Sequence, residues 1–116
     1  MSKVTVVGAG NVGATCANVL VTTGVADEVV LIDIKEGLSE GKSMDIMQTA
    51  NILNINTRLT GVTNDYEKTA GSDVVVITSG NVPFNALFNF PDISIYSLYI
   101  FLKSSVWYLT AVPFEL

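Results

Sequence analysis

Three glycines and one acid near the amino terminus have the types and spacing that point to chemistry. Gly8, Gly10 and Gly13 form the pattern G-x-G-x-x-G within GAGNVG, and Asp33 follows 20 residues after Gly13. Glycines at these positions permit a tight turn, a close approach of the backbone to a phosphate and close packing of a helix on a sheet. A carboxylate at Asp33 can accept hydrogen bonds from ribose hydroxyls and would repel a 2′-phosphate. The pattern predicts a dinucleotide site that takes NAD rather than NADP.

The start of the following helix completes this prediction. A helix that begins near Asn11 would direct free N–H groups and the positive end of its dipole toward the pyrophosphate. Ile34, which directly follows Asp33, is expected to lie against the adenine. The alternative is that the glycines only make turns and that Asp33 is a solvated acid at a strand end. The strand before the motif and the helix after it favour the cofactor site.

Alternating strands and helices are expected to position these residues. Apolar, β-branched runs predict strands at 3–8, 28–34, 58–62 and 73–79. The last run, DVVVITS, has almost no polar alternation, as expected for a strand that is covered on both faces. Strands that alternate with helices predict an α/β fold with a parallel sheet. We expect a partial Rossmann fold with strand order 3-2-1-4.

Two helices are predicted, at 11–23 and 39–52. Gly24 ends the first helix, and Ser39 is expected to be the N-cap of the second. Each helix is expected to turn an apolar face toward the sheet. These residues are Val12, Cys16, Val19 and Leu20 in the first helix, and Met44, Met47 and Ala50 in the second.

Composition excludes several classes of function. The chain of 116 residues suits one domain, and 49% apolar with 15% charged residues argues against disorder. A net charge of −5 with six scattered basic residues disfavours nucleic acid. The chain has no histidine, so it lacks the commonest general base and metal ligand, and we predict no catalytic residue and no metal site. One cysteine, Cys16, and no recognisable signal peptide favour the cytoplasm.

The composition changes abruptly near residue 80. All nine glycines precede this point, whereas all three prolines and nine of the ten aromatic residues follow it. We therefore divide the chain into 1–80, the first part of a cofactor domain, and 81–116, an aberrant aromatic-rich tail. The tail is interpreted as a frameshift or gene-model artefact, as a membrane segment at 93–112, or as a genuine segment that covers the sheet. Lys103 at the centre of 93–112 disfavours the membrane.

Residues 1–80 resemble the lactate/malate dehydrogenase superfamily, and most closely the bacterial malate dehydrogenases of lactate dehydrogenase type. The resemblance rests on VTVVGAGNVGATCANVL, EVVLIDI, EGKSMDIMQ and TGVTNDYEKTAGSDVVVITSG, which occur in this order. It implies NAD as cofactor, a small 2-hydroxy acid as substrate of the full-length family, oxidation of malate to oxaloacetate in the tricarboxylic acid cycle, and homo-oligomers. The implied cofactor residues are Gly8, Ala9, Gly10, Asn11, Val12, Gly13, Asp33, Ile34, Ser79 and Gly80.

The resemblance stops after Gly80. The family continues with a loop that carries two substrate-binding arginines, whereas this chain reads NVPFNALFNFPDIS, with Pro83 near the position of the first arginine. The family's catalytic histidine and aspartate and its third arginine are also missing. We therefore expect this chain to keep only the adenosine and pyrophosphate part of the NAD site and to be inactive alone. The alternative is a regulatory module that binds NAD(H) without chemistry.

Overall fold

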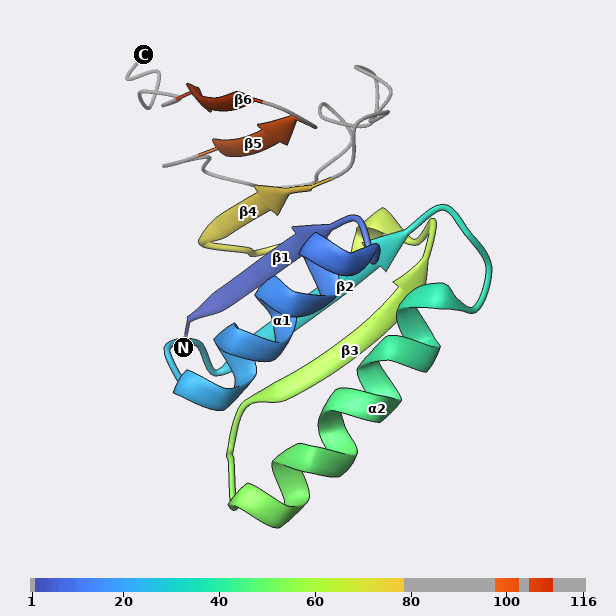
Figure 1. Ribbon diagram of the computed structural model, residues 1–116, viewed down its shortest axis with the longest axis vertical. Helices are drawn as coiled ribbons and strands as arrows, with labels where there is room; N and C mark the ends of the chain where they lie inside the picture. The colour runs from blue at the N-terminus through green and yellow to red at the C-terminus, as the bar shows by residue number, and fades with distance from the viewer. Residues whose placement is uncertain (1, 79–97, 103–104, 110–116) are drawn as a thin grey trace.

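A single twisted sheet organises the protein (Figure 1). The computed structural model describes residues 2–78, 98–102 and 105–109. The strand order is β3-β2-β1-β4-β5-β6. Neighbouring strands from β3 to β5 are parallel, and β6 is antiparallel to β5. The predicted α/β class and the order 3-2-1-4 are confirmed. The strands are β1 (Lys3–Val7), β2 (Glu28–Asp33), β3 (Arg58–Thr63), β4 (Val74–Ile77), β5 (Leu98–Leu102) and β6 (Ser105–Leu109).

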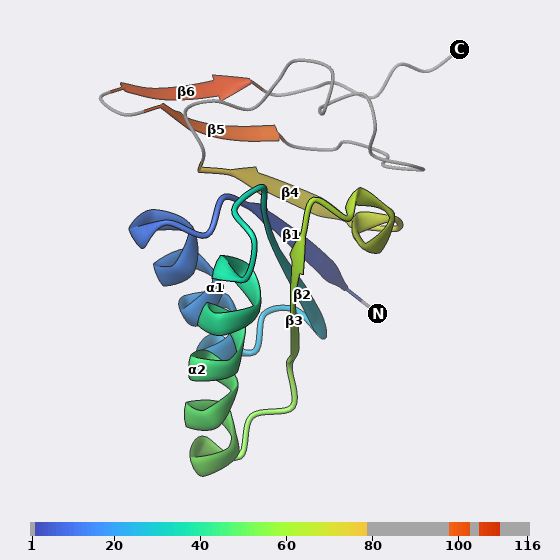
Figure 2. The same cartoon turned by 90° about the vertical axis from the view of Figure 1, so that its right-hand side faces the viewer.

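Helices cover the two faces of this sheet unequally. The helices α1 (Asn11–Thr23) and α2 (Leu38–Leu53) lie side by side on one face, and the short 3-10 helix η1 (Tyr66–Thr69) lies on the other (Figure 2). In the part of the chain that the structure describes, no helix is both long and apolar enough to span a bilayer.

Both faces of the sheet can be covered because successive side chains along a strand point to opposite faces. Val4 and Val6 of β1 join the core beneath α1 and α2, whereas Val7 joins Ile32 and Ile77 on the face with η1. All five of these residues are buried. The nearly continuous apolar runs in the sequence are therefore what a strand covered on both faces requires.

Helix α1 has the predicted bounds but not the predicted face. Its buried residues are Gly13, Ala17 and Val21, and Cys16 and Leu20 pack at the edge of the core. Val12 and Val19 are 59% and 52% exposed, so the expectation that they face the sheet is wrong. Small residues occupy the contact because they let the helix axis lie close to the strands.

Helix α2 also departs from the prediction. It begins at Leu38 with Gly37 as the N-cap, so the assignment of Ser39 as N-cap is wrong. Ser39 instead lies buried in the first turn. Met44 is 65% exposed rather than part of the core, whereas Met47 packs against the core as expected. The buried face again consists of small side chains, and the close approach of α2 to β3 leaves no room for larger ones.

Candidate cofactor site

The glycine motif forms the turn between β1 and α1, at the carboxyl ends of the parallel strands. Gly8 has a φ of 104°, a conformation that a residue with a Cβ rarely adopts. Its N–H donates to the Ile32 carbonyl oxygen at 2.8 Å, which joins the turn to the end of β2. The turn and Asp33 therefore lie at the same edge of the sheet, where ligands bind in open parallel α/β folds.

Gly13 permits the close contact between α1 and this turn. A Cβ at Gly13 would collide with the carbonyl group of Gly8 and would lie 2.8 Å from Thr78 Oγ1. The obstacle is backbone, so it cannot move aside as a flexible side chain would. Glycine is therefore required at this position for the helix to start where it does.

Gly10 has the opposite surroundings. A Cβ at Gly10 would meet no heavy atom within 4 Å, and Gly10 is exposed at the N-cap of α1. No side chain caps this helix end, and Asn11 and Val12 are exposed in its first turn. The open space above Gly10 and the free N–H groups beside it fit a pyrophosphate. Packing among the described residues does not require glycine here, whereas the close approach of a phosphate to the backbone would.

Asp33 is fixed by two backbone donors. The Ala9 N–H donates to its Oδ2 at 2.7 Å, and the Lys35 N–H donates to its Oδ1 at 2.9 Å. A carboxylate can accept about four hydrogen bonds, so each oxygen keeps capacity for another donor. The carboxylate thus links the glycine turn to the segment after β2 and can still accept bonds from two ribose hydroxyls.

Tyr66 adds an aromatic side chain near this acid, on the face of the sheet opposite α1 and α2. It packs against the core residues of that face, among them Ile32 and Val62. Burial raises the pKa of the Tyr66 phenol, and the negative charge of Asp33 raises it further. The phenol therefore stays protonated and uncharged at neutral pH, so it adds no second negative charge beside Asp33.

The other predicted site residues are placed unevenly. Ile34 is 67% exposed beside Asp33, where its side chain is accessible to a ligand. Ser79 and Gly80 lie outside the described residues. Sequence reasoning missed Thr78 as a part of the site. Its Oγ1 donates to the carbonyl oxygens of Val7 and Gly8 at 3.1 and 3.2 Å, which fixes the first residue of the turn.

Arg58 lies at the wrong end of the sheet to bind a substrate at this edge. It begins β3, whereas Asp33 ends the parallel neighbour β2, and its guanidinium pairs with Glu28 at 3.3 Å. Its side chain is 67% exposed, so this pair contributes at most about 1 kcal/mol to stability. Within 2–78 and the two tail strands, no group of three His, Cys, Asp or Glu side chains could hold a metal ion.

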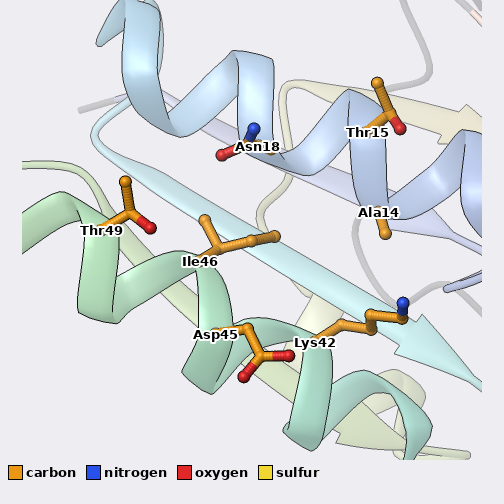
Figure 3. Close-up of a pocket in the computed structure, with 7 residues that line it drawn as sticks. All are labelled: Ala14, Thr15, Asn18, Lys42, Asp45, Ile46 and Thr49. Carbon is orange, nitrogen blue, oxygen red and sulfur yellow. The ribbon is translucent and has the colours of Figure 1, made fainter.

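A separate open groove of about 310 Å³ lies between α1 and α2 (Figure 3). Asn18 of α1 and Ile46 and Lys42 of α2 are among its lining residues. None of the residues predicted to bind the cofactor lines it. The groove therefore adds nothing to the site at the carboxyl edge of the sheet.

The parallel sheet, the glycine turn and the strand-end acid together define a Rossmann-type dinucleotide-binding protein. Residues 2–83 match the family model described as lactate/malate dehydrogenase, NAD binding domain. The chain belongs to this family, whose cofactor is NAD.

Relatives and solved structures give the same result. Malate dehydrogenase of Parabacteroides distasonis is 75% identical over 80 residues, which are 69% of this chain and 26% of that protein. The structure of malate dehydrogenase from Salinibacter ruber matches with a TM-score of 0.65 and 52% identity, over 68% of this chain and 26% of that one. Lactate dehydrogenase from Cryptosporidium parvum, solved with lactic acid and NAD, matches with a TM-score of 0.65 and 35% identity, over 71% and 25% of the two chains. The chain thus spans about a quarter of the length of the relatives it matches.

Proposed function

We propose that this chain binds NAD(H) through the turn Gly8–Gly13 and Asp33, as the adenosine- and pyrophosphate-binding part of a malate dehydrogenase. The observation that carries the proposal is the contrast within the turn: Gly13 is required by packing, whereas Gly10 has open space above it. The free N–H groups at the start of α1 would hold the pyrophosphate. Asp33 would accept hydrogen bonds from the adenosine ribose, and Ile34 would lie against the adenine.

Titration of the purified chain with NADH and with NADPH tests this proposal. We expect weak binding of NADH and weaker binding of NADPH, because the Asp33 carboxylate would repel a 2′-phosphate. The Asp33→Asn variant should reduce the preference for NADH, since it removes the charge and keeps the size of the side chain. Failure to bind NADH, or equal affinity for both cofactors, would refute the proposal.

The reaction of the family is the oxidation of malate, and we propose that this chain does not catalyse it alone. NAD supplies the hydride acceptor in such a reaction. The protein must supply a base for the hydroxyl proton and cationic groups for the carboxylates. The chain has no histidine, and its one arginine lies at the opposite end of the sheet. An assay of NADH formation with malate should give no rate above background, and measurable turnover would refute this part.

We further propose that the family pattern ends near residue 80 and that 81–116 lies outside it. The family match ends at residue 83, and the alignment with the Parabacteroides distasonis enzyme spans 80 residues, which supports this division. Sequencing the source DNA through codon 80, with the intact mass of the native product, tests it. A reading frame that continues into an arginine loop and a histidine motif would mark the tail as an artefact. An intact mass that includes the aromatic tail would instead show it to be a genuine part of the product.

A further inference from the structure

The turn that follows Asp33 connects the proposed ribose site to helix α2. Its residues, 34–37, are all exposed, so hydrophobic packing does not hold them in place. Gly37 is the N-cap of α2 and has no side chain with which to cap the helix. Other groups must therefore fix the end of this turn, and the structure identifies them on β3 and within α2.

Thr63, the last residue of β3, links the two ends of the first turn of α2. The Gly37 N–H donates to Thr63 Oγ1 at 3.3 Å. The same hydroxyl donates to the Glu40 carboxylate, with its Oγ1 2.7 and 3.0 Å from the two oxygens. A hydroxyl has one proton and two lone pairs, so donation to the carboxylate leaves it free to accept from Gly37. The three groups form a relay that runs from Gly37 through Thr63 to Glu40.

This relay resembles a capping box with one additional member. In a capping box, the acid at the third helical position accepts a bond from the N–H of the N-cap residue. Glu40 occupies the third helical position after Gly37, but the hydroxyl of Thr63 stands between them. The start of α2 is therefore stabilised from the neighbouring strand, and its geometry depends on β3.

Asp33 shares the same strand end. Thr63 is the register partner of Asp33, and the Asn64 N–H donates to the Asp33 carbonyl oxygen at 3.0 Å. The Asp33 side chain in turn accepts from the Lys35 N–H, which belongs to the exposed turn. Displacement of the turn would remove that bond and leave the carboxylate held by the Ala9 N–H alone.

We propose that the Gly37–Thr63–Glu40 relay holds the turn 34–37 and thereby orients Asp33 toward an adenosine ribose with a free 2′-hydroxyl. This inference rests on the proposed function. Thr63 and Glu40 act as positioning residues, because their side-chain hydrogen bonds join the turn to α2 and do not reach Asp33. Their contribution should appear in the selectivity between NAD(H) and NADP(H), not only in stability.

The test compares Thr63→Val with Thr63→Ser in the 116-residue chain. Valine has the shape of threonine without the hydroxyl, whereas serine keeps the hydroxyl. We expect Thr63→Val to lower the ratio of the NADPH and NADH dissociation constants by about fivefold to tenfold, the effect of losing about one hydrogen bond. Thr63→Ser should restore most of the ratio. Thr60→Val, on the same strand and outside the relay, is the matched control and should leave the ratio unchanged.

Amide hydrogen exchange of the cofactor-free protein gives an independent measure. Exchange at Lys35 and Gly37 should become about tenfold faster in Thr63→Val and in Glu40→Ala. Unchanged exchange would overturn the relay, and equal weakening of NADH and NADPH binding would overturn its role at the ribose. If the unaltered chain does not bind NADH, the proposed function fails and the ribose role fails with it. Faster exchange in the variants would then still support a relay that holds the turn.

Discussion

The helices α1 and α2 approach the same sheet in the same way, but only one approach could be recognised from a motif. The contact of each helix with the sheet includes a glycine at which a Cβ would have no room. This glycine lies in the helix for α1 (Gly13) and in the strand β3 for α2 (Gly61). At Gly13 the obstacle is the carbonyl group of Gly8, and at Gly61 it is the backbone of Ser39 with Ser43 Oγ at 2.6 Å. Gly13 belongs to a cofactor fingerprint, whereas Gly61 belongs to none. A glycine within a fingerprint can therefore be required by packing, as Gly13 is, whereas another glycine of the same fingerprint, Gly10, has open space above it.

The largest expected effect is that of Gly13→Ala. The new Cβ would collide with backbone, so α1 would have to move away from β1 as a unit. We expect a loss of about 4 kcal/mol in the free energy of unfolding, in the range of severe overpacking. Urea denaturation followed by circular dichroism measures it. A loss below about 1 kcal/mol would show that α1 adjusts easily and would remove the basis for the comparison.

Gly61→Ala should have the next largest effect, a loss of about 2–3 kcal/mol. The Cβ would collide with the first turn of α2, which is open to solvent on its outer side and can shift more than α1. Gly41→Ala is the matched control on α2, because a Cβ there meets no heavy atom within 4 Å. This control should gain about 0.5–1 kcal/mol from helix propensity. Similar results for the two variants would mean that the close contact at Gly61 does not limit stability.

Gly10→Ala separates binding from packing within the fingerprint. The free energy of unfolding should change little, since the Cβ enters open space and the φ of −68° suits alanine. The dissociation constant for NADH should rise by about tenfold or more, equivalent to about 1.4 kcal/mol, because the methyl group occupies the space proposed for the pyrophosphate. Fluorescence titration beside the unaltered chain measures this change. Unimpaired binding would place the pyrophosphate elsewhere.

The smallest effect concerns the face of the sheet that neither α1 nor α2 covers. The pKa of Tyr66 is raised in the folded state by burial and by Asp33. The unfolded chain would lose this proton first, near the ordinary pKa of about 10, so stability should decrease as the pH rises above that value. Tyr66→Phe should make the free energy of unfolding less sensitive to pH above about 10, measured by urea denaturation against the unaltered chain. Identical pH profiles would contradict the raised pKa.

Patterns carried by single segments could be predicted from the sequence. The bounds of α1 were predicted correctly because the fingerprint precedes it and Gly24 ends it with a φ of 66°. The order of the first four strands followed from the fingerprint together with the alternation of strands and helices. Each of these features depends on backbone preferences that neighbouring residues reveal.

Features that arise from contact between distant segments could not be predicted in the same way. Helical periodicity placed Val12, Val19 and Met44 toward the sheet, but small residues occupy those contacts because the helices lie so close to the strands. A signal did exist for Gly61, because a glycine within a strand often marks the close approach of another backbone. No local signal marks the bonds of Thr63, since they join β3 to α2 across 23 and 26 residues.

The hydroxyl of Thr78 has a consequence for the order in which the protein can be built during synthesis. Thr78 fixes the carbonyl of Val7 from 71 positions further along the chain, and β4 supplies the second neighbour of β1. The glycine turn is therefore translated well before the hydroxyl that completes it. At about 5–20 residues per second, a nascent chain would keep one edge of its central strand unpaired for several seconds after β2 has emerged. In this protein β1 is made before either of its neighbours, and the edge that β4 will cover is open to other strands in the meantime.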